Sequence, residues 1–160
     1  NQQHLAQAGY MQYEVSAYAK ENQQCQHNLN YWKFGDYIGI GAGAHGKISD
    51  AAQQSITRRS KQKQPQAYLE HAGRDSVIQT NETIAERAIG YEFMLNALRL
   101  TDGFATPLFY QHTGLAISHI NKQLEHAERE GLITRDIHRI TPTAKGQQYL
   151  NTLIELFLPE

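Results

Sequence analysis

The sequence predicts an α/β fold at the start of the chain, followed by a mainly α-helical, winged-helix-like domain. Three observations lead to this prediction. A helix, a glycine and an alternating strand pattern open the chain, a glycine-rich stretch follows at residues 39–46, and helical periodicity dominates from residue 81 onward. We therefore expect a first domain at residues 1–64 and a second at residues 65–160.

The overall composition is that of a globular protein without a strong electrostatic partner. The chain has 160 residues, of which 40% are apolar, a formal charge of −1 and a pI near 6.8. Because it carries no excess of basic residues, we expect no nucleic-acid partner. Its apolar runs are too short to span a membrane. Its single cysteine, Cys25, cannot form an internal disulfide and fits the reducing cytoplasm, where we expect the protein.

Residues 1–9 are expected to form a helix that ends at Gly9. Residues 10–18 then alternate between apolar and polar side chains, which is typical of a strand, and a second strand is expected at residues 38–42. Helix, glycine and strand is the repeating unit of a parallel α/β sheet, but two strands do not make such a sheet. We therefore expect the chain to be the C-terminal piece of a larger protein.

A polar segment at residues 49–64 shows no sustained periodicity, so we expect a surface loop there. Its basic residues are either solvated or contact an anion. Pro65 is expected to begin a short helix that runs to His71 and ends at Gly73. The basic residues of the loop are Arg58, Arg59, Lys61 and Lys63.

The last 80 residues predict a series of helices. Thr83 and Glu86 fit a capping box at the start of a long helix that ends before Gly103. The elements that follow are short helices at 106–112 and 117–130, a hairpin at 132–140, and a last helix capped by Thr141 with Pro142 at its first position. Three helices, a hairpin and a helix are the order of a winged-helix domain.

A winged-helix domain raises the hypothesis of DNA binding, with residues 115–130 as the helix that enters a groove. The charges of this helix argue against it, because acidic side chains there would repel phosphate groups. We therefore expect a packing or docking module. The charged residues are Glu125, Glu128 and Glu130 against Lys122 and Arg129.

The stretch at residues 26–46 is the best candidate for a functional site, since it holds the only tryptophan and five of the 12 glycines. His27 is its one strong ligand. The residues alone leave open whether His27 binds a metal or haem or is a structural histidine. The aromatic residues around it that would wall a flat pocket are Tyr31, Trp32, Phe34 and Tyr37.

The glycines at residues 41, 43 and 46 match the dinucleotide fingerprint Gly-x-Gly-x-x-Gly. The residues after them have the composition of a loop, whereas a nucleotide-binding glycine loop opens a helix. Nicotinamide binding is therefore disfavoured. Two other interpretations stay open, namely a cradle for a different adenosyl group and a tight bend at a strand end.

Three motifs together resemble a known family, and two later segments extend the likeness. The motifs are residues 13–19 (YEVSAYA), 27–32 (HNLNYW) and 36–46 (DYIGIGAGAHG), and the later segments are residues 91–100 and 131–133. They resemble the C-terminal part of the radical S-adenosylmethionine proteins related to oxygen-independent coproporphyrinogen III oxidase. The likeness is closest to the haem-chaperone branch, with which the HNxxYW motif is associated.

This resemblance implies a fold and a set of site residues. The first domain would supply the closing strands of a partial TIM-like barrel, and the second would be the family's C-terminal domain. A histidine nitrogen is a normal donor to haem iron. The implied residues are His27 as axial haem ligand, Tyr31 and Trp32 as pocket walls, and Gly41, Gly43 and His45 as contacts of S-adenosylmethionine.

The resemblance also implies a function. The intact protein would be a chaperone that binds haem and delivers it to acceptors such as membrane-bound respiratory enzymes. The alternative is the oxidase, a radical enzyme that decarboxylates coproporphyrinogen III. A third interpretation is that this region only stabilises the barrel and docks a partner. We also consider a second copy of the same protein as a partner, which would make a homodimer.

One departure from the family pattern limits what this chain can do alone. The family holds a [4Fe–4S] cluster on a Cys-x-x-x-Cys-x-x-Cys motif, and this sequence has one cysteine. The cluster and the bound S-adenosylmethionine therefore belong to the intact protein. We do not expect the chain alone to be an active enzyme.

Overall fold

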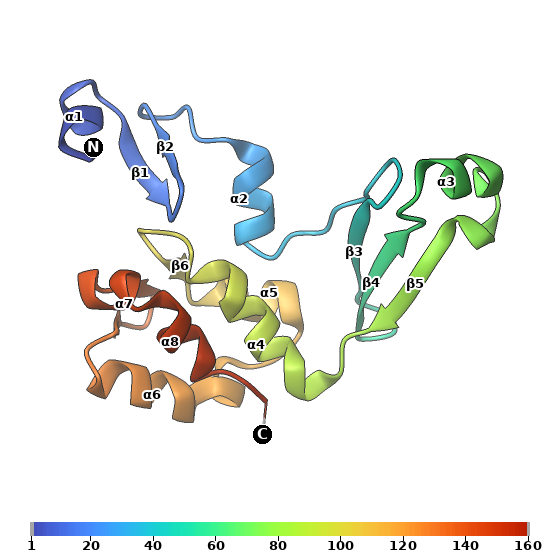
Figure 1. Cartoon of the computed structure of the whole chain (residues 1–160). Coiled ribbons are helices and arrows are strands. Elements are labelled where there is room, and N and C mark those ends of the chain that lie inside the picture. The colour runs from blue at the N-terminus through green and yellow to red at the C-terminus, as the bar shows by residue number, and fades with distance from the viewer. Residues whose placement is uncertain (1, 160) are drawn as a thin grey trace. The chain divides into compact units, whose positions relative to one another are not determined.

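A computed structural model describes residues 2–159, which divide into two compact units (Figure 1). The larger unit comprises the described residues of Asn1–Phe34 and Arg87–Glu160, and the smaller unit is Gly35–Glu86. Residues 1 and 160, the first of the predicted opening helix and the last of the predicted second domain, lie outside the described residues. The mixed α/β character predicted from the sequence is confirmed, and the domain boundary expected after residue 64 stays a prediction.

The larger unit begins with a short helix and a hairpin. These elements are α1 (Gln2–Gln7), β1 (Met11–Glu14) and β2 (Ala17–Ala19). The helix ends before Gly9, as predicted, and Gly9 has a φ of +79°, a conformation that glycine adopts without strain. The two strands pair antiparallel.

The prediction of one continuous strand at residues 10–18 is wrong. Val15 and Ser16 form a turn between β1 and β2, and the register shifts between Gln12 and Glu14. Such an irregularity reverses the faces to which the following side chains point. Glu14 is therefore only 2% exposed while Val15 is exposed, the opposite of what simple alternation predicts.

The rest of the larger unit combines helices with a three-stranded antiparallel sheet of strand order β6-β8-β7. The elements are α2 (Gln26–Trp32), α4 (Glu86–Ala97), β6 (Phe104–Ala105), α5 (Pro107–Thr113), the 3-10 helix η2 (Ile117–Ile120), α6 (Asn121–Arg129), β7 (Ile133–Arg135), β8 (Arg139–Pro142), α7 (Ala144–Gln148) and α8 (Leu150–Glu155). The predicted hairpin and the helices that end at Gly114 and Gly131 are confirmed.

Two predicted helix caps are wrong by two residues. Thr83 ends a strand, and α4 begins at Glu86. Pro142 still pairs with Ile133 across the hairpin, so the last helical segment starts later than predicted. Its cap is Thr143, whose hydroxyl accepts a hydrogen bond from the backbone nitrogen of Gly146 at 3.0 Å.

The core of the larger unit is centred on Phe93 of α4, which is fully buried. Its ring meets those of Phe104 and Phe109 edge-on at 5.1 Å between centroids, and that of Phe34 at 5.8 Å. This is the geometry that aromatic pairs prefer. Phe34 is 1% exposed and has a φ of +61°, so the segment that follows α2 is held in an uncommon conformation by burial.

The smaller unit is a three-stranded antiparallel sheet of strand order β3-β4-β5. Its elements are β3 (His45–Asp50), β4 (Ser55–Lys61), α3 (Pro65–His71), the 3-10 helix η1 (Asp75–Val77) and β5 (Ile78–Thr83). The helix predicted from Pro65 to His71 is confirmed, and Gly73 follows it with a φ of +77°.

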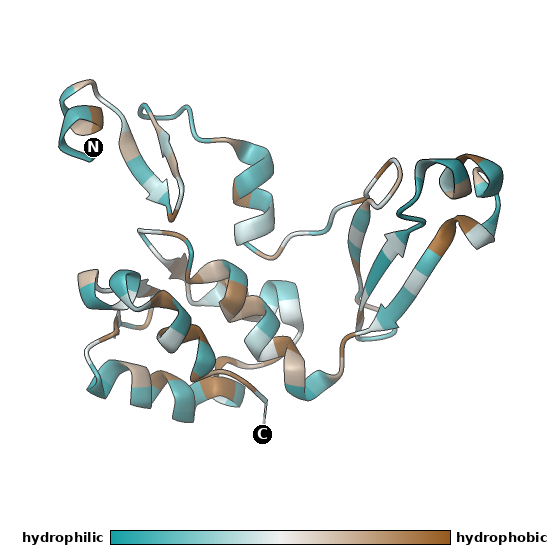
Figure 2. Ribbon diagram, in the orientation of Figure 1, coloured by the Kyte–Doolittle hydropathy of each residue, from teal (hydrophilic) through white to brown (hydrophobic). Residues whose placement is uncertain are grey.

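Two other predictions for the smaller unit are wrong. Residues 38–42 form no strand, and their two isoleucines are 78% and 86% exposed at positions 38 and 40. The loop predicted at residues 49–64 is instead largely the β3–β4 hairpin. Figure 2 shows mainly hydrophilic colours on these strands. Because polar side chains lie on both faces, the strands lack the alternation by which a strand is recognised in a sequence.

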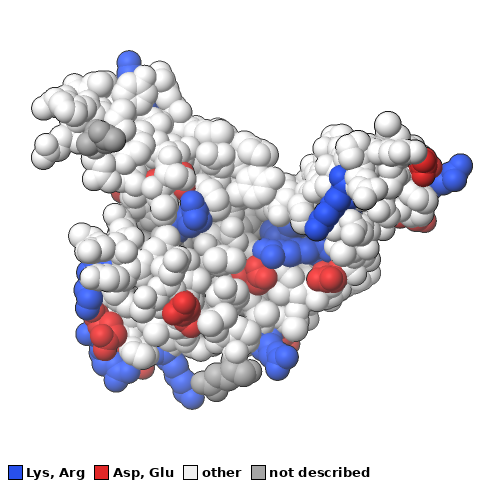
Figure 3. All heavy atoms as spheres, in the orientation of Figure 1, with Lys and Arg blue, Asp and Glu red and all other residues white. Residues whose placement is uncertain are grey.

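No helix within residues 2–159 combines the length and apolar character needed to cross a membrane. On the face drawn in Figure 3, basic and acidic side chains are intermingled over the larger unit.

Candidate functional site

His27 lies in the first turn of α2, and its side chain is exposed. The ring of Tyr31, one helical turn later, meets the imidazole edge-on with 4.8 Å between ring centroids and an interplanar angle of 78°. Residues four apart lie on the same helix face, which explains this contact. The structure thus brings together two of the predicted haem residues on an accessible surface.

Trp32 lies on a different side of α2, because each residue advances a helix by about 100°. Its ring packs against a buried apolar cluster that includes Tyr13, Leu29 and Leu100. The guanidinium carbon of Arg99 lies 4.3 Å from the centroid of the Trp32 ring. Trp32 therefore anchors the helix, and the structure does not place it beside His27.

Arg99 also forms a partly buried ion pair with Glu14. Glu14 is 2% exposed and accepts hydrogen bonds from Arg99 Nη2 at 3.4 Å and from the hydroxyl of Ser16 at 3.0 Å. A buried carboxylate needs such partners. Arg99 thereby links β1 to α2. No local sequence pattern predicts this network, because Glu14 and Arg99 are 85 residues apart.

These residues fit one kind of haem contact. An accessible imidazole beside an aromatic ring suits an axial ligand to iron approached from solvent. Among residues 2–159, no group of three or more His, Cys, Asp or Glu side chains is arranged to hold a bare metal ion. Cys25, exposed and two residues before His27, is the rival ligand on this surface.

The glycine-rich segment in the smaller unit closes on its own chain. The backbones of Tyr37 and Lys47 exchange two hydrogen bonds of 2.9 Å. A β-carbon at Gly39 would lie 2.1 Å from the carbonyl oxygen of His45, and one at Gly46 would lie 3.2 Å from that of Tyr37. These two glycines permit the close approach of one strand end to the other.

Gly41 and Gly43 have a different role. They adopt φ values of +106° and +68°, in the region that favours glycine. A β-carbon at Gly41 would have no atom of the described residues within 4 Å. The segment leads into β3, whereas a dinucleotide loop leads into a helix. His45 begins β3 with an exposed side chain.

A cleft of about 300 Å³ lies beside this segment. Its walls are mainly apolar, and Arg59 and Lys61 contribute positive charge. Arg59 is held by a hydrogen bond from its Nε to Asn81 Oδ1 of 2.8 Å. The apolar and glycine side of the cleft consists of Tyr37, Ile38, Gly39, Ala44, Gly46, Ile48 and Ile78. The volume is at the lower end of the range for small-molecule sites.

Asp36 and Lys47 hold the two ends of the glycine segment together. The ammonium of Lys47, 2% exposed, donates to Asp36 Oδ1 at 2.9 Å and to the hydroxyl of Ser49 at 3.2 Å. Burial lowers the pKa of Lys47, and its hydrogen bond to Asp36 opposes this shift. Burial acts to raise the pKa of Asp36, but the hydrogen bonds from Lys47 and Ser49 outweigh it and place that pKa below 3.8.

We predict that Gly39→Ala lowers the free energy of unfolding by about 2 kcal/mol, because the new methyl group overlaps the backbone of His45. Gly41→Ala is the matched control, since only its backbone conformation is affected, at a cost of about 1 kcal/mol. Urea denaturation followed by circular dichroism measures both variants. Equal losses in the two variants would contradict the steric explanation.

Comparisons with known proteins show which proteins this chain resembles. Residues 84–149 match the family described as the HemN C-terminal domain. The chain is 41% identical over 156 residues, 98% of its length, to "Heme chaperone HemW" of Haemophilus influenzae, and 42% identical over the same number to that of Escherichia coli.

The chain belongs to the HemW family. It spans about 40% of the length of the HemW relatives that it matches, 39% and 40% for these two proteins. The solved structure of Escherichia coli coproporphyrinogen III oxidase, HemN, described as a radical SAM enzyme, matches 97% of this chain with a TM-score of 0.64 and 16% identity. The match covers 38% of that structure and shows a shared HemN-type fold.

Proposed function

We propose that this chain is the haem-binding region of a HemW-type chaperone that delivers haem to acceptor proteins such as respiratory enzymes. The observation that carries the proposal is the accessible imidazole of His27 beside the Tyr31 ring. The names of the HemW relatives point to the same cargo. In this function haem is a substrate that is bound and released, and His27 would be its axial ligand.

An exposed ligand suits a transfer function. Haem held deep in a closed pocket exchanges slowly, whereas haem held at an open helix face is accessible to a competing ligand of an acceptor. Tyr31 would pack against one side of the imidazole and limit its rotation. Trp32 would act indirectly in this proposal, by fixing α2 against Arg99.

We further propose that the glycine-rich segment contributes to S-adenosylmethionine binding in the full-length protein. Gly41, Gly43 and His45 adjoin the apolar cleft in sequence, and Gly39 and Gly46 form part of its wall. Such a surface suits a flat adenosyl group with little steric obstruction. The accompanying [4Fe–4S] cluster would be held by cysteines that this chain does not contain.

The finer features of the fold are part of the same proposal. We propose that α4, α5, α6 and the β6-β8-β7 sheet form a winged-helix domain, since their order along the chain is that of the motif. Residues 1–64 would complete a partial barrel in the full-length protein. The lone cysteine fits a cytoplasmic location.

Haem titration of the His27→Ala variant tests the proposal. We expect at least about tenfold weaker binding, read from the Soret absorbance, because the iron loses its axial ligand. His126→Ala is the matched control, since His126 is also an exposed histidine on a helix, α6. Cys25→Ser tests the rival ligand. Unchanged Soret absorbance in His27→Ala, with a loss in Cys25→Ser, would remove His27 from the mechanism.

The alternative function, oxidative decarboxylation of coproporphyrinogen III, has the shared fold with HemN in its favour. Anaerobic assay of the reconstituted full-length protein distinguishes the two functions. Haem binding without conversion of coproporphyrinogen III favours the chaperone, and conversion favours the oxidase.

A further inference from the structure

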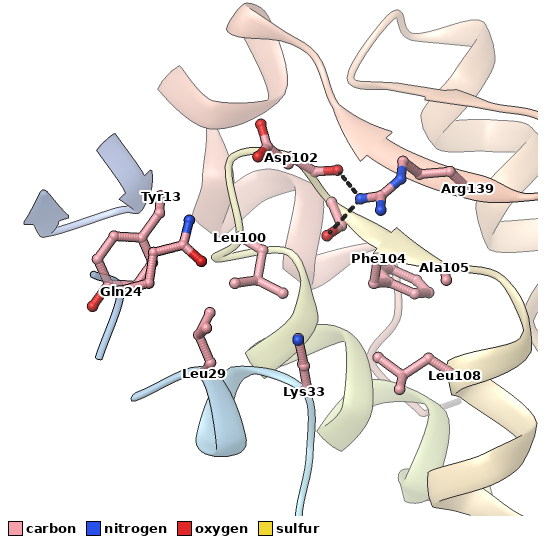
Figure 4. Close-up of a pocket in the computed structure, with 11 residues that line it drawn as sticks. Tyr13, Gln24, Leu29, Lys33, Leu100, Asp102, Phe104, Ala105, Leu108 and Arg139 are labelled. Atoms are coloured by element: carbon pink, nitrogen blue, oxygen red, sulfur yellow. Dashed lines mark hydrogen bonds between the residues drawn. The ribbon is translucent and has the colours of Figure 1, made fainter. Parts of the chain in front are cut away.

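A second cleft, in the larger unit, is not used by the function proposed above. Its volume is about 310 Å³, and Figure 4 shows the residues that line it. Segments that are distant in the sequence form its walls, namely β1, residues 24–33 around α2, residues 100–105, α5 and β8. It lies on the side of α2 that carries Leu29 and Lys33, whereas His27 points elsewhere on that helix.

The floor of this cleft is apolar and already packed. Leu29, Leu100 and Phe104 are 9%, 5% and 2% exposed, so most of each side chain is fixed by the core. Phe104 also contacts Phe93 edge-on. A floor that is part of the core keeps its shape without a ligand, and preformed apolar surface of this kind is typical of small-molecule sites.

Two basic side chains lie at opposite edges of the apolar floor. In Figure 4 the exposed Lys33 extends its ammonium group toward the floor between Leu29 and Phe104. On the other edge, Arg139 Nη1 donates to the backbone carbonyls of Asp102 at 2.6 Å and Gly103 at 3.4 Å. These bonds fix the position of the guanidinium group.

The one acidic residue of the lining does not neutralise Lys33. The carboxylate of Asp102 points away from Lys33 in Figure 4, and its backbone carbonyl is the group that faces Arg139. The opening therefore presents positive charge beside apolar side chains, on a lining that is polar and apolar in similar measure. This combination recognises a carboxylate that is attached to an apolar body.

We propose that this cleft binds such an amphipathic carboxylate, with its charged group on Lys33 and its apolar body against Leu100 and Phe104. Two ligands share this chemistry, a propionate-bearing edge of a tetrapyrrole and a free hydrophobic carboxylate. The tetrapyrrole source rests on the proposed haem function, and the free carboxylate does not.

Calorimetric titration of the chain with 1-naphthoate tests the proposal, and 1-naphthamide is the uncharged probe of similar shape. We expect Lys33→Ala to weaken naphthoate binding about tenfold, the effect of one charge-assisted hydrogen bond, and to leave naphthamide binding unchanged. Lys122→Ala, which removes an exposed lysine of α6 outside the cleft, should leave both unchanged.

A second variant tests the apolar part of the site. Ala105 lines the cleft and is exposed, so Ala105→Leu should fill the opening without disturbing the core. We expect it to abolish binding of both probes. Naphthoate binding that is unchanged in Lys33→Ala, or that persists in Ala105→Leu, would overturn the proposal whatever the result for His27.

Titration with haem and with its dimethyl ester identifies the source of the ligand. If Lys33→Ala weakens binding of haem and not of the ester, the carboxylate belongs to the tetrapyrrole. If Lys33→Ala weakens only naphthoate binding, the cleft takes a free hydrophobic carboxylate. A failure of the haem function would appear separately, as the absence of a Soret band when the parent chain is titrated with haem.

Discussion

Replacing Phe93 with alanine is expected to lower the free energy of unfolding of the larger unit by about 4 kcal/mol. The side chain is fully buried, and its ring contacts three other phenylalanines at 5.1–5.8 Å between centroids. Truncation would leave a cavity and remove these edge-on contacts, each of which adds about 0.5–1.5 kcal/mol. Urea denaturation followed by far-UV circular dichroism measures the loss.

The control for this variant is Tyr110→Ala. Tyr110 is an aromatic residue of α5 in the same unit but is 65% exposed, so its replacement should change stability by less than about 0.5 kcal/mol. Similar losses in both variants would show that Phe93 is not the centre of the core. Because Phe34 lies two residues after the end of α2 and packs on Phe93, we also expect weaker haem binding in Phe93→Ala.

Asp36→Asn is expected to cost about 3 kcal/mol, because it leaves the buried ammonium of Lys47 without its carboxylate partner. The amide retains the shape of the carboxylate and can still accept from Ser49, so the change isolates the charge. Asp75→Asn, at an exposed site in η1, is the matched control and should be neutral within about 0.5 kcal/mol. Thermal unfolding of the two variants compares them directly.

The same ion pair predicts a dependence on pH. Folding lowers the pKa of Asp36 below its ordinary value of 3.8. At pH values between the folded-state pKa and 3.8, the unfolded chain therefore binds more protons at this residue than the folded chain. Its contribution to stability is complete above about pH 5 and is lost as the pH falls through the folded-state pKa. The stability difference between the parent chain and Asp36→Asn should therefore shrink below pH 3.8. A constant difference down to pH 2 would contradict this account.

Elements with strong local signals were predictable from the sequence. The helix that ends before Gly9 and the helices that end at Gly114 and Gly131 follow from glycines that adopt positive φ after a helix. The β7–β8 hairpin follows from two apolar runs around a short polar turn. The β3–β4–β5 sheet was not predictable, because backbone pairing and the buried Lys47 stabilise it without an apolar face that alternates along each strand.

The candidate site was predictable only where its residues are close in sequence. His27 and Tyr31 are four residues apart on one helix, and the structure brings their rings together. The stacking of Arg99 on Trp32 and the two cations around the cleft in the larger unit join segments that are far apart. No periodicity or motif within a single segment reports such contacts.

The two ends of α2 are held very differently. Its C-terminal end is fixed by Trp32 and by the buried Phe34, while Cys25, before its first turn, provides no side-chain hydrogen bond to the exposed backbone nitrogens. An uncapped first turn unwinds at lower cost than a capped one. In the function proposed above, the haem ligand His27 therefore lies in the turn of α2 that unwinds at the lowest cost. This turn can change conformation during transfer while the C-terminal end of the helix stays fixed.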